Sequence, residues 1–146
     1  MTTANVATRR GNGTLDCDGA QIRAYCHHLA TVVTIRGVID AANVDWVGAY
    51  ILRFTLGSDP VVLDLSDLSY FAADGISLLR SFDEDCRAAG VEWTLVAGAA
   101  ISDLLDDGRD EDAFPMTRSV REALHNLADA IASRRQLVLP LIRKTA

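Results

Sequence analysis

The chain has 146 residues, a mass of 15.8 kDa and a formal net charge of −6. This length is typical of one domain, and a hydrophobic content of 49% supplies a core that needs neither disulfides nor a structural metal. An acidic chain lacks the basic face that binding to a phosphate backbone requires. Nucleic acid is therefore not expected as a direct partner.

Three features place the chain away from membranes and secretion. The longest apolar stretches, such as Leu137–Ile142, hold about six residues, far fewer than the roughly 20 that cross a bilayer. Residues 1–13 are polar and lack the apolar core of a secretory signal. Cys17, Cys26 and Cys86 are odd in number and form no C-x-x-C, which is typical of reduced thiols. We expect a cytoplasmic protein without a membrane span.

The first half of the chain reads as a lead-in, a hairpin and a helix. Residues 1–14 are small and polar, which predicts a disordered lead-in before a domain at 15–134. Within 20–37, two β-rich runs flank a break of two or three residues at His27–His28, which predicts a hairpin. Apolar residues then recur at helical spacing and predict a helix that opens near Asp40 as its N-cap: Val44, Val47, Ile51 and Phe54.

The second half alternates strands and helices. Val61–Leu65 is nearly all apolar and predicts a buried strand, and a helix is expected from about Gly75 to Ala89, with Gly90 ending it. Further elements are expected over 92–96 (strand), 101–105 (helix), 114–117 (strand) and a last helix carrying Val120, Leu124, Leu127 and Ile131. This alternation predicts an α/β fold, with a mixed sheet of four to five strands and about four helices packed on it.

The C-terminal tail, residues 135–146, contains the apolar run Leu137–Ile142 interrupted by Pro140. Because proline removes a helical hydrogen bond, we expect the tail to pack on the domain or on a second subunit rather than to continue the helix.

Four segments in order carry a resemblance to a known family. The pattern resembles the STAS domain, the fold of bacterial anti-sigma factor antagonists, over roughly Leu15 to Arg134. The segments are Ile35–Ala41, Val61–Leu68, Tyr70–Ile76, and Phe114–Thr117 followed by Ser119–Leu124. Their order and spacing are more specific for the fold than for the activity.

The resemblance implies a docking site but no phosphorylation switch. Aligned on Gly75, the family's Asp-Ser-Ser-Gly segment corresponds here to Ala72-Ala73-Asp74-Gly75, so the acceptor serine is replaced by Ala73. An anti-sigma factor or related ATPase-type kinase would dock through the loop and helix start at 67–77, without phosphate control. The resemblance implies these partner-binding residues: Asp40, Asp64, Ala72, Ala73, Asp74 and Gly75.

Two questions about this segment stay open in the sequence. Asp74 suits an N-cap of the helix, and it also suits a docking surface that Gly75 would let a partner approach closely. If the register differs, Ser66, Ser69 or Ser77 is the alternative phosphoacceptor, although such hydroxyls more often bind nearby backbone groups.

Other patterns point away from metals, cofactors and catalysis. The acidic run Asp103–Asp112 does not match a calcium-binding loop, and His27, His28 and His125 have no zinc spacing. The sequence shows no nucleophile elbow and no glycine-rich phosphate loop after a strand. We therefore expect no metal site, no cofactor and no enzyme activity.

The thiols are the remaining reactive groups. Cys86 shares an apolar helix face and is expected to be buried and inert. Cys17 and Cys26 would lie roughly 30 Å apart in an extended chain, so they can pair only if the chain turns back, for which Asp18–Gly19 is a possible site.

A second hypothesis is a structural or assembly module. In that interpretation the fold has lost its switch, and the run Leu137–Ile142 holds a homodimer or a larger signalling complex.

Overall fold

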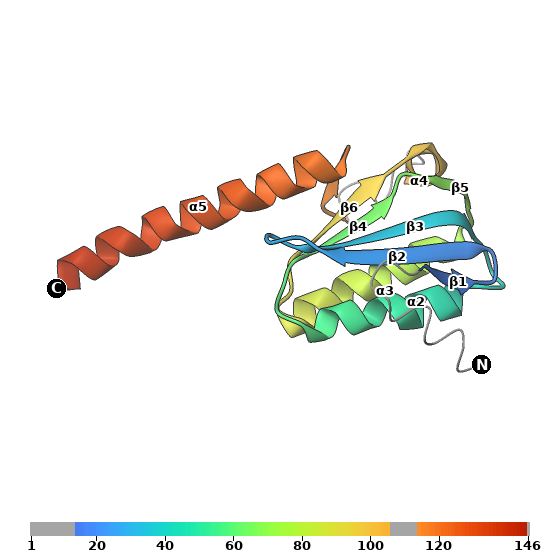
Figure 1. The fold of residues 1–146 in the computed structure, drawn as a ribbon, viewed down its shortest axis with the longest axis horizontal. Helices are drawn as coiled ribbons and strands as arrows, with labels where there is room; N and C mark the ends of the chain where they lie inside the picture. Colours follow the sequence, from blue (N-terminus) through green and yellow to red (C-terminus); the bar gives the residue numbers. More distant parts are fainter. Residues whose placement is uncertain (1–13, 106–113, 146) are drawn as a thin grey trace.

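A twisted sheet with helices on both faces forms the domain (Figure 1). The computed structural model describes residues 14–105 and 114–145, with the backbone alone for Leu105 and 135–145. In these residues seven strands run in the order β1-β2-β3-β4-β6-β7, and β5 pairs with β3 beside β4. The predicted α/β class is therefore confirmed. The predicted lead-in lies outside the described residues apart from Thr14.

The elements follow the expected alternation, with more strands than expected. The predicted number of four to five strands was too low. β1, β5 and β7 hold only two to four residues each, too few to show the alternation of apolar and polar residues that marks a strand. The elements are β1 Leu15–Cys17, β2 Ala20–Cys26, β3 Thr31–Ile39, α2 Val44–Leu52, η1 Arg53–Leu56, β4 Val61–Leu65, β5 Leu68–Phe71, α3 Asp74–Ala89, β6 Trp93–Ala97, α4 Ala99–Leu105, β7 Met116–Thr117 and α5 Val120–Thr145.

The N-terminal strands are antiparallel and the others are parallel. β2 pairs with β3 from Ala20↔Gly37 to Cys26↔Thr31, which confirms the predicted hairpin; its turn spans 27–30, longer than expected. β3, β4, β6 and β7 pair in parallel, and each crossover carries helical residues. Because parallel strands point the same way, their carboxyl ends meet at one end of the sheet.

A bulge at Gly37 lets β3 serve two neighbours. Residues 31–34 of β3 pair with β4, whereas Gly37–Ile39 pair with β5, and the register shifts between Gly37 and Val38. Gly37 has φ +96°, and a Cβ there would lie 2.3 Å from the carbonyl oxygen of Gly19. Only glycine fits this position, because an L side chain would meet both backbone strain and a backbone clash.

Alternation along the strands builds one core on each face of the sheet. On one face, Val33, Leu63 and Leu95 belong to a large cluster that α2 and α3 cover. On the other face, six residues form a smaller cluster that α5 covers: Ala30, Val32, Val62, Val96, Ala123 and Leu127. The two helical layers are therefore separated by the full thickness of the sheet (Figure 1).

Helix α5 continues where the sequence predicted a break. It extends through Pro140 to Thr145, so the expectation that the tail leaves the helix was wrong. Proline removes one backbone hydrogen bond, but the leucine, arginine and lysine residues around it favour a helix. Figure 1 shows the C-terminal part of α5 projecting beyond the sheet, away from α2 and α3.

Candidate functional site

The carboxyl ends of β3 and β5 bring most of the predicted docking residues together. Asp40 follows β3, and Ala72–Gly75 follow β5. The two chain segments are joined where the Ala72 N–H donates to the Ile39 carbonyl oxygen at 2.8 Å. Five of the six predicted residues thus lie at one end of the sheet, beside the start of α3.

The start of α3 differs in detail from the prediction. The cap position is held by Ala73, whose methyl group cannot accept a hydrogen bond, and Asp74 is the first helical residue rather than the N-cap. Both side chains are exposed. A carboxylate in the first turn is still favoured there, because the free N–H groups and the helix dipole attract negative charge. At its other end α3 terminates at Gly90, as predicted, in a left-handed conformation.

Gly75 is buried under the domain's own Phe71. A Cβ at position 75 would lie 2.4 Å from the Phe71 ring, which is itself only 3% exposed. The close approach that glycine permits is used for internal packing between β5 and α3. This packing fixes where Ala73 and Asp74 stand on the surface.

Asp40 organises the turn before α2. Its Oδ1 accepts hydrogen bonds from the N–H groups of Ala42 and Asn43 at 3.0 and 3.2 Å. The helix itself begins only at Val44, so Asp40 caps the preceding turn rather than the helix proper. Asp40 thus caps backbone N–H groups as an N-cap residue does, but in the turn that precedes α2.

Asn43 is a buried polar residue that sequence reasoning missed. Its Oδ1 accepts from the Asp40 N–H at 2.9 Å, and its Nδ2 donates to the carbonyl oxygens of Val38 and Asp18 at 2.9 and 3.1 Å. The side chain is 0% exposed. It thereby ties the β1–β2 turn, the end of β3 and the start of α2 into one unit next to the docking residues.

Asp64 does not join the other predicted residues. It alternates with Leu63 and Leu65 of the large core, which places it on the opposite face of the sheet from α2 and α3. Its Oδ1 accepts from the backbone N–H of Ser66 at 3.1 Å and from the Ser66 hydroxyl at 2.6 Å. The structure thus assigns Asp64 to the turn between β4 and β5.

The three alternative phosphoacceptors differ in their surroundings. Ser66 donates to Asp64, and the Ser69 hydroxyl donates to the Gly37 carbonyl oxygen at 2.9 Å, so both support the turn and the bulge. Ser77 is exposed on α3, one turn after Asp74. Its position is the closest of the three to the start of α3.

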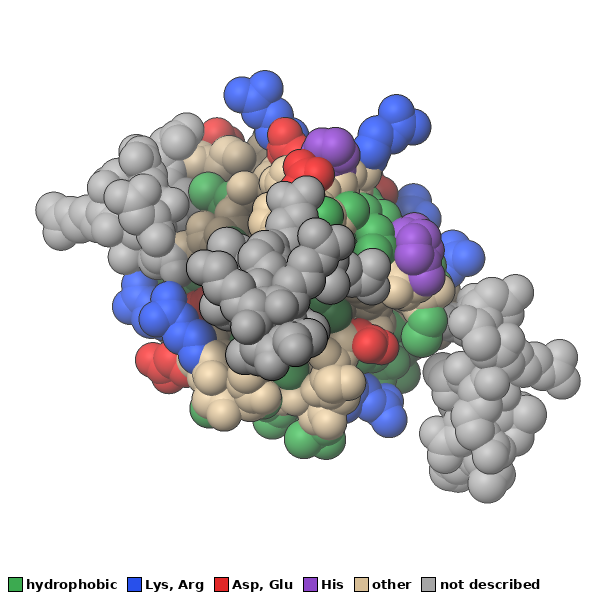
Figure 2. Space-filling model, turned by 90° about the vertical axis from the view of Figure 1, so that its left-hand side faces the viewer, with side chains coloured by type: hydrophobic (Ala, Val, Ile, Leu, Met, Phe, Trp, Pro, Cys, Tyr) green, Lys and Arg blue, Asp and Glu red, His purple; other side chains and the backbone are tan. Residues whose placement is uncertain are grey.

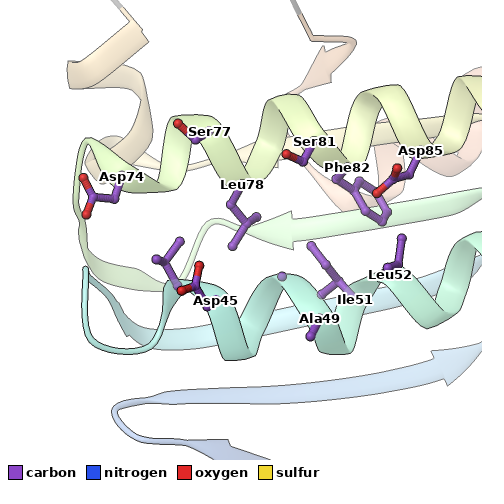
Figure 3. A pocket seen from close by; sticks show the side chains of 12 residues that line it. Asp45, Ala49, Ile51, Leu52, Asp74, Ser77, Leu78, Ser81, Phe82 and Asp85 are labelled. Carbon is purple, nitrogen blue, oxygen red and sulfur yellow. The ribbon is translucent and has the colours of Figure 1, made fainter.

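A groove runs between α2 and α3 beside this site (Figure 3). It has a volume of about 300 Å³, and we call it the α2/α3 groove. Its floor is apolar, with Ile51, Leu78 and Phe82 between the helices. The remaining lining residues are Val44, Asp45, Gly48, Ala49, Leu52, Asp74, Ser77, Ser81 and Asp85.

The α2/α3 groove is acidic at both ends. Asp45 and Asp74 lie at the amino ends of α2 and α3, and Asp85 lies toward the other end of α3 (Figure 3). No lysine, arginine or histidine lines the groove in the described residues. An apolar floor with carboxylates at both ends favours a ligand that is apolar in the middle and basic at its ends.

Two aromatic side chains near the same end are unusually exposed. Trp46, next to Asp45, is 50% exposed, and Tyr70 of β5 is 54% exposed. Exposed Trp and Tyr residues are typical of protein interfaces, where they often carry much of the binding energy. The sequence analysis did not identify either aromatic residue as a candidate for binding. Spacing alone does place Asp74, Leu78, Ser81 and Asp85 on one face of α3.

Within the part of the chain that the structure describes, the other sequence patterns do not assemble into a chemical site. Most of the acidic run, residues 106–112, lies outside the described part of the chain, and Asp103 is exposed on α4. His27 and His28 stack with ring centroids 4.3 Å apart. Residues 14–104 and 114–134 contain no group of three side chains placed to ligate a metal ion.

The face of the molecule that Figure 2 shows is mixed in charge. Over the end of the molecule that carries the β2–β3 turn, basic side chains alternate with acidic, apolar and polar ones (Figure 2). Among the described helices, none is both long enough and apolar enough to cross a membrane.

The cysteines are free thiols in distinct environments. Cys17 and Cys86 are buried and Cys26 is exposed. Asp18–Gly19 does turn the chain back, but it pairs Cys17 with Ala20, six residues of strand or about 20 Å from Cys26. Burial, with the charges of Asp83 and Asp85, raises the pKa of Cys86 to about 12. The prediction of a buried Cys86 is confirmed.

Only Cys26 is expected to react quickly with Ellman's reagent in the folded protein near pH 8. The thiolate is the nucleophile, and burial both shields Cys17 and Cys86 and keeps their protons bound. The measurement is the absorbance released per chain before and after denaturation, with one fast thiol expected before and three after. Cys26→Ser serves as the control and should abolish the fast phase; a fast phase of two thiols would contradict these environments.

Comparison with known proteins identifies the family. The model of the STAS domain matches residues 21–123. The chain belongs to the STAS domain family. Its match spans β2 to the first turn of α5, and so includes both predicted strands of the hairpin and the start of α3.

Relatives agree with this assignment. The chain is 62% identical to a protein of Mycobacterium tuberculosis named osmosensory protein A, over 97% of this chain and 92% of that protein. In structure it is similar to an anti-sigma factor antagonist from Mycobacterium paratuberculosis, with a TM-score of 0.69, 22% identity, and coverage of 77% of this chain and 97% of that one. It is also similar to a STAS domain protein from Planctomyces limnophilus, with a TM-score of 0.61, 20% identity, and coverage of 73% of this chain and 97% of that one. The chain is thus a STAS protein with the fold of anti-sigma factor antagonists.

Proposed function

We propose that this STAS protein is a non-enzymatic cytoplasmic regulator that docks an anti-sigma factor or a related ATPase-type kinase. The contact would be made by the loop and helix start at 67–77, together with the adjoining α2/α3 groove. Ala73 would leave the complex without phosphate control on this chain.

One observation carries the proposal. The start of α3 exposes Ala73 and Asp74, and Asp74 lines the apolar groove. The neighbouring elements α2 and β5 carry the half-exposed rings of Trp46 and Tyr70. A protein of this family needs no catalytic group for such a role, because binding alone can remove an anti-sigma factor from its target. An apolar groove floor, exposed aromatic side chains on the adjoining elements and a fixed charge are usual parts of a specific interface.

The missing hydroxyl sets the regulation. Phosphorylation adds about −1.5 to −2 charges and would place them at a helix start beside the groove. Ala73 cannot accept that group, and Asp74 contributes one permanent, smaller negative charge. The protein would therefore stay competent to bind after the kinase has received ATP, because residue 73 cannot take up the phosphoryl group.

The name of the 62% identical relative suggests a signalling context. That protein is called osmosensory protein A, and we propose that this chain likewise acts in a response to osmolarity. Because Ala73 cannot be phosphorylated, the response would then be controlled at a position other than residue 73.

Ala73→Ser is expected to restore a phosphoacceptor. The variant and the wild-type chain are incubated with purified anti-sigma kinases of the same bacterium and Mg-ATP, and intact mass is read alongside calorimetric binding. The wild-type chain should bind one kinase equally with and without Mg-ATP and gain no phosphate, whereas Ala73→Ser should gain one phosphate and lose affinity roughly tenfold or more.

A matched control tests whether the effect requires a hydroxyl at position 73 or only an added serine on the surface. Ala88→Ser adds a hydroxyl to an exposed alanine in the last turn of α3 and should behave as the wild type. Phosphate on the wild-type chain at Ser66, Ser69 or Ser77 would contradict the unswitchable interface. Absence of binding to every such kinase would favour the assembly module as the function.

A further inference from the structure

The α2/α3 groove and the C-terminal end of α5 match in charge and length. The groove has an apolar floor with Asp45 and Asp74 at one end and Asp85 at the other. Residues 135–146 carry the apolar run Leu137–Ile142 between Arg135 and the pair Arg143–Lys144, with no acidic residue. The chain therefore contains both an acidic groove and a segment of the kind that such a groove selects.

The dimensions agree as well. At about 1.5 Å per helical residue, Asp74 and Asp85 are about 16 Å apart along α3. By the same measure Arg135 lies about 12 to 14 Å from Arg143 and Lys144 in α5. The reach of arginine and lysine side chains covers the remaining difference.

A chain cannot place this segment in its own groove. Ala123 and Leu127 hold α5 on the sheet face opposite α2 and α3, and Arg134 forms an ion pair with Glu92 further along. Beyond that point α5 projects away from the domain (Figure 1). The segment is thus presented outward, toward another molecule.

We propose that residues 135–144 of one copy dock in the α2/α3 groove of a second copy, with the exchange made in both directions. Each copy has one groove and one projecting helix end, so a two-fold arrangement fills both grooves and closes the assembly at a dimer. Since Asp74 lines the groove, the dimer would cover the surface that we propose for the partner. Dimerisation and partner binding would then compete for this surface, and only this competition rests on the proposed function.

The first test is the mass of the full-length protein by analytical ultracentrifugation over a wide range of concentration. A dimer is expected, with a dissociation constant that rises with salt because the charge pairs at the groove ends are partly exposed. Only monomer throughout the range would overturn the proposal, as would a dimer whose stability does not respond to salt.

Charge reversal then identifies the two surfaces. Asp45→Lys with Asp85→Lys makes a groove-reversed chain, and Arg135→Glu with Arg143→Glu and Lys144→Glu makes a tail-reversed chain. Each alone should dimerise at least roughly tenfold more weakly than the wild type, since groove and tail then carry like charges. Mixed together, they should form a one-to-one heterodimer, because each groove again faces a tail of opposite charge.

Controls keep the outcome specific. Asp103→Lys with Asp129→Lys makes the same charge change at exposed positions outside the groove and should leave the dimer intact. Equal weakening by this pair, or failure of the mixed chains to associate, would overturn the assignment. These measurements of dimerisation do not depend on any kinase. If a kinase binds the monomer and the dimer equally well, the proposed competition is wrong but the proposed dimer still stands.

Discussion

Asn43→Ala is expected to lower the free energy of unfolding by about 3 kcal/mol. The side chain is fully buried and serves three backbone groups, the N–H of Asp40 and the carbonyl oxygens of Val38 and Asp18. Its removal leaves those groups unpaired in a site that alanine is too small to fill. Urea unfolding followed by circular dichroism measures the change.

Two further variants test the cause. Asn126→Ala, at an exposed position on α5, should change stability by no more than about 0.5 kcal/mol. Asn43→Asp keeps the acceptor for Asp40 but turns a charged oxygen toward two carbonyl groups, so its ionised form is disfavoured in the folded state. Its loss of stability relative to the wild type should shrink as pH falls and the carboxyl regains a proton to donate. A loss independent of pH would contradict the hydrogen-bond geometry.

The role of Asn43 illustrates what sequence patterns predict here and what they leave out. The hairpin, the buried strand at 61–65 and helix α3 follow from period and turn residues, which are local properties. Asn43 looks like an ordinary polar residue before a helix, because its partners are 5 and 25 positions away in the chain. Burial of a polar side chain is a property of the folded arrangement.

The candidate site shows the same division. Placing Asp40 beside Ala72–Gly75 followed from the family pattern, and the structure brings them together at the ends of β3 and β5. Asp64 belongs to the same pattern but lies on the other face, since one step along a strand reverses the direction of a side chain. The α2/α3 groove needed the packing of two helices distant in sequence, so only its α3 face was present in the spacing of residues.

A methyl group at position 75 is expected to destabilise the protein by about 2 kcal/mol, although alanine favours a helix over glycine by about 1 kcal/mol. In Gly75→Ala the new carbon would lie 2.4 to 2.9 Å from three atoms of the Phe71 ring. That ring is enclosed by the core and cannot swing away, so α3 and β5 must separate. Thermal and urea unfolding measure the loss.

Gly48→Ala provides the matched comparison, because the same change in another helix causes no clash. Its new carbon would lie 3.8 Å from Leu78, an ordinary contact, so helix propensity should raise stability by up to about 1 kcal/mol. The two substitutions should therefore have opposite signs. Equal gains from both would show that the Phe71 ring does not constrain the start of α3.

A double-mutant cycle with Phe71→Leu isolates the contact. Removing the ring should relieve the clash, so the loss caused by Gly75→Ala should be smaller in the Phe71→Leu background than in the wild type. Additive losses would contradict the geometry. Because the same contact positions Ala73 and Asp74, Gly75→Ala should also weaken the binding of any partner that docks there. If the partner binds the start of α3, adding Phe71→Leu should restore part of that affinity.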